Sequence, residues 1–475
     1  MTATSTTSPQ PIDASCRLPL FALFGGSAAW LALGSVLGLL GSLRFHAPAM
    51  LADCAALSYG RVFPASQFLL VYGFCIPAGL AVGLWLLARL GRVELARPWL
   101  IAFGAKLWHL GVLVGSVAIL AGETTGHELL EAPRYASVIL FLGFLMMALW
   151  AFVTHTRRNE SALYPSQWFV LAALFWFPWI FTSATLLLQW FPVRGMAQAA
   201  VAWWFAGNLL NVWLPLAGLA ASFYFLPKIA GRPLQSRYLA LFVFLTLAIF
   251  GTWTGIPSGT ALPAWMPALS NGAKTLSLVP FLAVAVMVIR TCRGAGVVCR
   301  GGPFCYFKFG ASSLVLVGCL MFLTACPVIN RVTDFTWYAH GQRFLLIYGF
   351  FGMTMFAAAY SILPHIVGAG AICPNRVRAQ FWLSMLGTLL LSIPLVIAGI
   401  LQGLKLMKPE IAFLDALQAS LMPFRISTLG EVLVIAGNLL FLFNVGYALI
   451  GHLRVVGKTA YAEAVAPLES VGVRS

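Results

Sequence analysis

The 475-residue chain contains few charged residues and very few histidines. Asp, Glu, Lys and Arg make up 9% of the residues, whereas hydrophobic residues make up 61% and the mean hydropathy is +0.91. This composition excludes a soluble globular domain, because such a domain carries about 25% charged residues. Only seven histidines are present, and only His109 lies well inside an apolar segment. A membrane protein that holds several metals within the bilayer would need more imidazole groups there.

Long apolar segments recur along the whole chain. Each contains roughly 18–25 residues, enough for a helix to cross about 30 Å of hydrocarbon. Because backbone groups within a bilayer must be hydrogen-bonded internally, the sequence predicts an all-α integral membrane protein with about twelve transmembrane helices in one bundle. We expect these helices at residues 18–43, 67–88, 99–121, 136–153, 166–190, 199–226, 238–254, 273–289, 310–326, 344–367, 381–402 and 428–450.

The spacers between these segments are short, and no Ser- or Pro-rich linker divides the chain. We therefore expect one twelve-helix membrane domain at residues 18–452. An N-terminal cytoplasmic tail at residues 1–17 and a C-terminal cytoplasmic tail at residues 453–475 would flank it.

The net charge of +16 is distributed unevenly between the loops. Basic residues concentrate in alternate loops, at Arg89, Arg92, Arg97, Arg157, Arg158, Lys228, Arg232, Arg237, Arg290, Arg293, Arg300, Lys308, Arg376 and Arg378. Cytoplasmic loops of membrane proteins are enriched in Lys and Arg, so we expect both termini in the cytoplasm. The positive charge thus indicates topology, and the expected partner is a lipid bilayer and not nucleic acid.

Nine cysteines are scattered along the chain, and Cys292, Cys299 and Cys305 share one loop. Their spacing matches neither a zinc knuckle nor a Cys-x-x-Cys redox pair. We expect reduced thiols with a structural role.

Several short motifs occur in a fixed order. They include GETTGHELLEAP at residues 122–133, WWFAGN at 203–208, PKIAGRP at 227–233, TALPAW at 260–265 and VTDFT at 332–336. In this order and spacing the chain resembles the catalytic subunit I of C-family heme–copper oxidases, the cbb-type cytochrome c oxidases. The resemblance covers most of the chain, from about Gly60 to the last span.

The resemblance implies a twelve-helix bundle that holds heme b and copper between its helices. Members of the family reduce oxygen and couple this reaction to proton pumping in the bacterial cytoplasmic membrane, beside other oxidase or cytochrome subunits. Six histidines would be required: two for a low-spin heme, one for a high-spin heme and three for copper.

At the positions that correspond to these ligands, the chain carries other residues: Ser66, Gly207, Ile256, Pro257, Gln342 and Phe344. By the resemblance, Ser66 replaces a low-spin heme ligand and Gly207 replaces a copper ligand. Ile256 and Pro257 lie where a His-His pair is expected, and Gln342-Arg343-Phe344 lies where a His-x-His pair serves both hemes. We therefore expect no bound heme and no bound copper.

Loss of a heme would leave a large void, and protein interiors are close-packed. We hypothesise that aromatic side chains fill this void. The candidates are Phe205, Trp253, Phe344, Tyr348 and Phe350.

Lys106 and His109 are three residues apart and so share one face of the third span. Ionisable residues within a membrane span are functional candidates, so one interpretation is a path for protons or a polar substrate. In the alternative, Lys106 extends to the interface and His109 is hydrogen-bonded. Glu128 and Glu131 belong to the following loop, where we expect a salt bridge or a contact with a partner subunit.

These features favour a cytochrome c oxidase subunit I-like respiratory membrane protein without catalytic residues of its own. It would act as an accessory or structural member of an oxidase or electron-transfer complex. A terminal oxidase or nitric oxide reductase with atypical ligands is the second hypothesis. A channel or transporter for protons or a small solute is the third.

Overall fold

The computed structural model describes residues 11–51, 53–294, 296–297, 299–368 and 370–472, and the regular structure in these ranges is helical. Eleven helical segments within them are long and apolar enough to cross a membrane. The remaining predicted span corresponds to the apolar helix Arg237–Gly251, which has 15 residues and is about 22 Å long. The predicted all-α membrane bundle is confirmed, and each predicted span overlaps an observed helix.

The helices in chain order are α1 (Pro11–His46), η1 (Ala55–Leu57), α2 (Tyr59–Phe68), η2 (Leu69–Cys75), α3 (Ile76–Gly91), α4 (Pro98–Ala121), α5 (Arg134–Thr156), α6 (Pro165–Thr185), η3 (Leu186–Trp190), α7 (Met196–Asn208), η4 (Leu209–Trp213), α8 (Leu214–Ala230), α9 (Arg237–Gly251), α10 (Trp265–Cys292), α11 (Pro303–Thr324), α12 (Pro327–Thr333), α13 (Tyr338–Phe344), η5 (Leu345–Gly352), α14 (Met353–Val367), α15 (Pro374–Leu406), α16 (Phe413–Gln418) and α17 (Leu421–Gly472). The segments η2, η3, η4 and η5 are π-helical and directly continue the α-helix before them. An α-helix follows η2, η4 and η5 directly, whereas η3 is the last part of its span.

Proline and glycine set several helix ends. α4, α6, α11 and α15 each begin at a proline. An N–H group at the first position of a helix has no partner within the helix, so proline, which lacks this group, loses no hydrogen bond there. Gly122 and Gly231 follow α4 and α8 with φ of +104° and +64°, a conformation that favours glycine. α1 begins at Pro11, before the predicted start of the first span, and α17 continues to Gly472. The predicted tails thus include helical residues.

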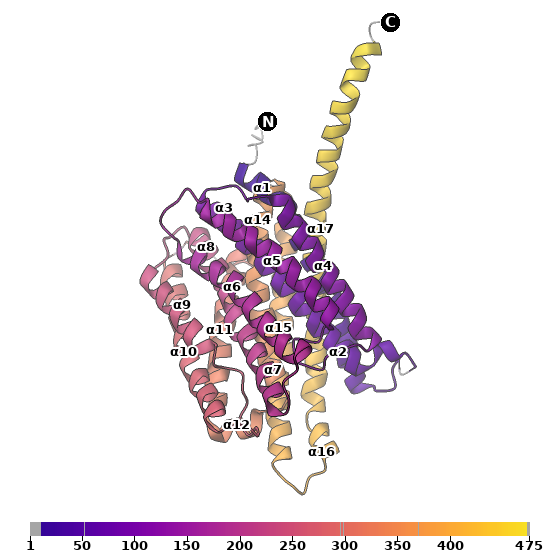
Figure 1. The fold of residues 1–475 in the computed structure, drawn as a ribbon, viewed down its shortest axis with the longest axis vertical. Coiled ribbons are helices and arrows are strands. Elements are labelled where there is room, and N and C mark those ends of the chain that lie inside the picture. Colours follow the sequence, from indigo (N-terminus) through magenta and orange to yellow (C-terminus); the bar gives the residue numbers. More distant parts are fainter. Residues whose placement is uncertain (1–10, 52, 295, 298, 369, 473–475) are drawn as a thin grey trace.

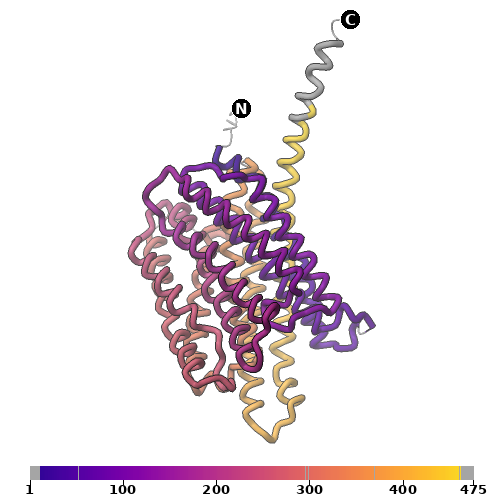
Figure 2. The backbone as a smooth tube through the Cα atoms, in the orientation of Figure 1, coloured from indigo at the N-terminus to yellow at the C-terminus, as the bar shows by residue number. Residues whose placement is uncertain are grey.

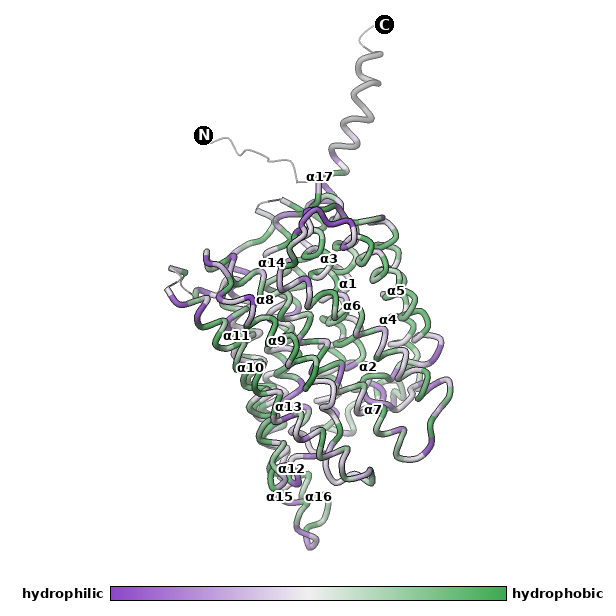
Figure 3. Tube along the Cα trace, turned by 60° about the vertical axis from the view of Figure 1, so that its left-hand side comes forward, coloured by the Kyte–Doolittle hydropathy of each residue, from purple (hydrophilic) through white to green (hydrophobic). Residues whose placement is uncertain are grey.

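α1 begins and α17 ends at the same end of the bundle (Figure 1), and the tube in Figure 2 follows the same path. We call this the N/C end. The loops that join α3 to α4, α5 to α6, α8 to α9, α10 to α11 and α14 to α15 lie at the N/C end, and these loops or their flanks carry the basic residues named above. Hydrophilic segments lie mainly at the two ends, and hydrophobic segments lie along the helices between them (Figure 3).

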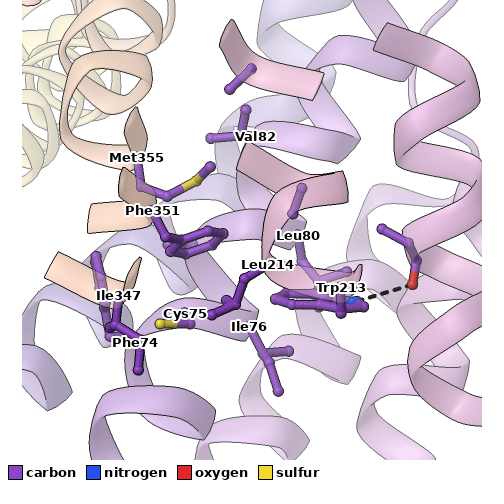
Figure 4. Close-up of a cluster of buried hydrophobic side chains, with 14 of the residues drawn as sticks. Phe74, Cys75, Ile76, Leu80, Val82, Trp213, Leu214, Ile347, Phe351 and Met355 are labelled. Carbon is purple, nitrogen blue, oxygen red and sulfur yellow. Dashed lines mark hydrogen bonds between the residues drawn. The ribbon is translucent and has the colours of Figure 1, made fainter. Parts of the chain in front are cut away.

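Three spans form the centre of the bundle. Within the most apolar stretch of each span, the share of residues that are buried is 100% in α2–η2–α3, 89% in α13–η5–α14 and 83% in α7–η4–α8. In the other spans this share is no more than 56%. Phe74 and Cys75 from η2, Trp213 from η4 and Phe351 from η5 meet in one buried cluster (Figure 4). The π-helical turns η2, η4 and η5 closely follow Ser66, Gly207 and Phe344, at which ligand histidines were expected. Such turns change the direction in which the following side chains point, and they are common near functional sites.

Cys299 in the loop before α11 and Cys305 in the first turn of α11 form a disulfide, with Cα atoms 5.3 Å apart. The prediction of reduced thiols is wrong for this pair. Gly301, with φ of +78°, reverses the chain between the two cysteines and brings their side chains together. This pairing depends on a local turn, which the spacing of the cysteines did not indicate.

Candidate functional site

A cavity of about 590 Å³ lies near the end of the bundle opposite the N/C end. Its wall includes parts of α7, α10, α13 and the loop after α12. Three of the six expected ligand positions line it, namely Gly207, Pro257 and Gln342. Its volume lies in the range of about 300–1,000 Å³ that is typical of small-molecule sites.

Gly207 allows the loop after α9 to lie directly against α7. A Cβ atom on Gly207 would overlap the carbonyl oxygen of Thr254 and would lie 3.0 Å from Cα of Gly255. Gly255 has φ of +120°, and a Cβ atom there would lie 2.5 Å from the carbonyl oxygen of Trp203. The two backbones therefore occupy the space that a side chain at position 207 would need.

Two asparagines hold this loop in place. Asn208 Nδ2 donates to the carbonyl oxygen of Thr252 at 3.1 Å, and Asn211 Nδ2 donates to Thr254 Oγ1 at 2.9 Å. Asn208 is fully buried and is the last residue of the WWFAGN motif. The motif thus has a structural role beside the cavity.

An ion pair between Arg343 and Glu128 lies at the cavity wall. Arg343 comes from α13, and its side chain is 8% exposed, whereas that of Glu128 is 43% exposed. The Arg343 guanidinium lowers the pKa of the Glu128 carboxyl, and burial opposes this effect only in part. Arg343 occupies the middle position of the expected His-x-His motif, so a cation stands between the two positions where imidazoles were expected.

Glu131 belongs to the same loop as Glu128 but faces the interior. Glu131 is 6% exposed, and its Oε1 accepts a hydrogen bond from the Leu129 amide at 2.9 Å. Burial raises the pKa of Glu131 to about 7. Glu131 thus closes a tight turn in which Leu129 has φ of +60°.

A hydrogen-bonded network joins the loop after α9 to the loop after α12. The Ser258 amide donates to Asp334 Oδ2 at 2.8 Å, and the side-chain amides of Asn271 and Asn330 both donate to Ser258 Oγ at 2.8 Å. Burial raises the pKa of Asp334, and the charge of Lys274 offsets this effect in part. Asp334 and Lys274 both line the cavity. Sequence analysis missed Lys274, although a lysine within a predicted span is itself a signal of function.

His340 is the one histidine in the cavity wall. Its ring lies 5.0 Å from Trp337 and 5.6 Å from Phe63, measured between ring centroids. Its Nδ1 is buried and has no hydrogen-bond partner among the described residues.

The other three expected ligand positions lie elsewhere. Ser66 is 3% exposed and donates to the carbonyl oxygen of Phe63 at 2.8 Å. Ile256 lines a separate apolar groove with Trp253 and Trp265. Phe344 packs against Tyr348, with ring centroids 6.0 Å apart. The six positions therefore do not converge on one cavity.

The hypothesis that aromatic side chains fill the void is wrong at Gly207, where the cavity remains open. Phe205 and Phe350 are fully buried, and Phe344 and Tyr348 are nearly so. Trp253, however, is 53% exposed on the outside of the bundle. Trp253 points to the outside and is not among the residues that line the cavity, so it does not fill the space beside Gly207.

Lys106 and His109 lie on α4, away from the cavity wall. Lys106 is exposed on the outer surface of the bundle. His109 Nδ1 accepts from Trp30 Nε1 at 3.2 Å, so Nε2 carries the hydrogen and donates to the carbonyl oxygen of Ala22 at 3.1 Å. With both ring nitrogens satisfied, the interaction partners of His109 are those of a structural histidine.

The all-helical bundle, with eleven helices long and apolar enough to cross a membrane among the described residues, is that of a multi-pass membrane protein. A family model described as "Cytochrome C and Quinol oxidase polypeptide I" matches residues 19–433, and the chain belongs to this family.

Three relatives cover most of the chain. A "Cytochrome c oxidase subunit 1 homolog" of Azorhizobium caulinodans is 25% identical over 95% of this chain and 84% of the relative. The "Cbb3-type cytochrome c oxidase subunit CcoN1" of Stutzerimonas stutzeri is 25% identical over 88% of this chain and 92% of the relative. A "Cytochrome c oxidase subunit 1 homolog, bacteroid" of Bradyrhizobium diazoefficiens is 26% identical over 87% of this chain and 79% of the relative. The expected resemblance to subunit I is confirmed.

The residues at the cavity do not fit the copper site of a heme–copper oxidase. Copper in such a site is held by several imidazoles, whereas the wall provides a single histidine together with Gly207, Pro257 and Gln342. An imidazole at position 207 would collide with the backbone of Thr254 and Gly255. Within the described ranges, no three His, Cys, Asp or Glu residues form a group that could hold a metal ion.

Proposed function

We propose that this subunit I-like protein is a non-catalytic member of a respiratory oxidase or electron-transfer complex in the bacterial cytoplasmic membrane. It would retain the bundle of the family without binding heme b or copper at the family's sites. It would assemble with other oxidase or cytochrome subunits, and both termini would lie in the cytoplasm.

One observation carries this proposal: the backbones at Gly207 and Gly255 occupy the space that a side chain would need at position 207, where the resemblance implies a copper ligand. The ion pair between Arg343 and Glu128 adds support, because it places a guanidinium between the two positions where the family motif is expected to have its ligands. A cation at this position would repel a metal ion, and its removal would leave Glu128 without its partner.

Purified protein tests the proposal directly. An absorption spectrum, a pyridine hemochrome assay and iron and copper analysis should show no stoichiometric heme or copper. The Stutzerimonas stutzeri relative, prepared in parallel, is the matched control for loss of cofactors during purification. Two hemes and one copper per chain, together with oxygen consumption, would falsify the proposal.

One observation favours the alternative of an oxidase or nitric oxide reductase with atypical ligands. His340 lines the cavity, and its Nδ1 has no hydrogen-bond partner in the described part of the chain. If this alternative holds, the purified protein has a Soret band, and the variant His340→Ala loses it. If the proposal holds, wild type and variant have the same spectrum without that band.

A further inference from the structure

The wall of the 590 Å³ cavity contains two opposite charges that do not meet. Lys274 on α10 and Asp334 in the loop after α12 both line the cavity. The salt bridges of the described residues include neither of them, so more than 4 Å separates the Lys274 ammonium nitrogen from the Asp334 carboxylate oxygens. In the same wall, Arg343 and Glu128 are in direct contact. Charges removed from bulk water are costly unless they are paired, so the open pair points to a site that a ligand completes.

Asp334 is held in place from one side only. Its Oδ2 accepts from the Ser258 amide at 2.8 Å, and Ser258 Oγ in turn accepts from the side-chain amides of Asn271 and Asn330 at 2.8 Å. The hydrogen bonds of the described residues leave Oδ1 of Asp334 free. A fixed carboxylate with one free oxygen in a cavity wall can accept a hydrogen bond from a ligand.

Lys274 lies close to this network. It is three residues after Asn271 on α10, so the two side chains share one face and lie about 4.5 Å apart along the helix axis. Because Asn271 contacts Ser258 and Ser258 contacts Asp334, the lysine and the aspartate lie on neighbouring parts of the wall. The gap between them is thus wide enough to admit a ligand and narrow enough for a small ligand to contact both charges.

The loop after α12 also forms the mouth of the cavity. Phe335, the residue after Asp334, has φ of +62°, a conformation that a bulky side chain rarely adopts. Such strain persists only where the surrounding structure imposes it, and it is common at binding sites. Phe335 and Phe413 both line the cavity, and each is 66% exposed. α12 lies at the end opposite the N/C end (Figures 1 and 3), so the cavity opens at that end.

The wall around these charges is largely apolar and aromatic. It includes Trp203, Leu210, Met321, Trp337 and Leu346. The ring centroids of Trp203 and Phe335 lie 6.2 Å apart, at the same side of the cavity as Asp334. Aromatic rings pack well against one another, so this wall favours a ligand with an aromatic body.

The charges of the wall favour a ligand that is neutral overall. The wall carries two acidic and two basic side chains, Glu128, Asp334, Lys274 and Arg343, and one acid and one base already form a pair. An anionic ligand would pair with Lys274 and leave Asp334 unpaired, and a cationic ligand would do the reverse. A zwitterion pairs with both, which is the arrangement that leaves no charge unpaired.

We propose that this cavity binds an aromatic α-amino acid, whose carboxylate pairs with Lys274 and whose ammonium pairs with Asp334. Its ring would pack between Trp203 and the other aromatic side chains of the wall. The ligand would enter from the end opposite the N/C end, which is the extracytoplasmic side in the proposed topology. The inference rests on the proposed function in one respect, because it requires a cavity that holds neither heme nor copper.

Binding is measured by equilibrium dialysis of the purified full chain against radiolabelled L-phenylalanine. Two unlabelled competitors each lack one charged group: phenethylamine has no carboxylate, and 3-phenylpropionate has no ammonium. We expect saturable binding of L-phenylalanine to wild type, and both competitors should bind about tenfold more weakly or worse, because each loses a hydrogen bond between charged groups. No saturable binding at millimolar concentration, or competitors that bind as tightly as L-phenylalanine, would overturn the proposal. This comparison needs no variant, so it holds even if a variant fails to fold.

Two variants separate ligand binding from a purely structural role. Lys274→Met should weaken L-phenylalanine about tenfold without weakening phenethylamine, which has no carboxylate to lose. Asp334→Asn keeps an oxygen for the Ser258 amide and should weaken L-phenylalanine about tenfold without weakening 3-phenylpropionate. Lys106→Met and Asp53→Asn, at exposed positions outside the cavity wall, are the matched controls and should bind like wild type. Equal weakening of all three ligands in either variant would show that the residue acts on the fold alone, and the proposal would fail.

A pyridine hemochrome assay of the same preparation separates this inference from the proposed function. Stoichiometric heme would overturn both proposals. A heme-free preparation that does not bind L-phenylalanine would overturn the amino acid site alone.

Discussion

Replacing Gly207 by alanine is expected to destabilise the protein, because the new methyl group has no space. The Cβ atom would overlap the Thr254 carbonyl oxygen and would lie 3.0 Å from Gly255 Cα. Both are backbone atoms, and the hydrogen bonds from Asn208 and Asn211 hold this loop against the helix. Inserting a methyl group into such a contact costs about 1–3 kcal/mol.

The measurement is the thermal unfolding midpoint of the detergent-solubilised protein. Gly272→Ala on α10 is the matched control, because nothing lies within 4 Å of its would-be Cβ atom. Alanine favours a helix over glycine by about 1 kcal/mol, so this variant should be as stable as wild type or more stable. If Gly207→Ala unfolds at the same temperature as wild type, or if Gly207→His binds copper, the backbone contact is not the reason for the missing ligand.

Three further predictions concern the loop side chains and the topology. Arg343→Met should lower the free energy of unfolding by about 2 kcal/mol in a denaturant titration, because a hydrogen bond between two charged groups, Arg343 and Glu128, is lost. Arg343→Lys keeps the positive charge and should lower the free energy of unfolding by less. Equal losses in the two variants would show that the ion pair contributes nothing. Glu131 has a pKa of about 7 in the folded protein against an ordinary value of about 4.3, so its own contribution to stability should be complete below about pH 4 and should be lost as the pH rises to about 7. Glu131→Gln should remove this part of the pH dependence in thermal unfolding at pH 5 and pH 8, and an unchanged dependence would exclude Glu131 as its source. A green fluorescent protein fused to the C-terminus should fluoresce and an alkaline phosphatase fusion should be inactive, because the basic loops lie at the N/C end; the opposite pattern would invert the topology.

The spans and the family could be predicted from the sequence because the signals for them are local. A run of apolar residues must be helical within a bilayer wherever it lies in the chain, so the predicted spans overlap the observed helices. Proline at the first turn and glycine after the last turn mark the helix ends at Pro98 and Gly122. Short motifs such as WWFAGN carried the resemblance without any knowledge of contacts.

The candidate site was predicted only in part. The sequence indicated that Gly207 and Gln342 are not metal ligands, but not that a cavity remains beside them. It indicated Glu128 but not its partner Arg343, which is 215 residues away.

By itself, the sequence determined where the apolar helices lie, the helical class and the family. Only the tertiary structure decided that Gly207 faces backbone and that Arg343 pairs with Glu128. The physical reason is that hydrophobicity and backbone hydrogen bonding act within a segment. Cavities and ion pairs, in contrast, form between segments that are distant in the chain and meet only when the helices pack.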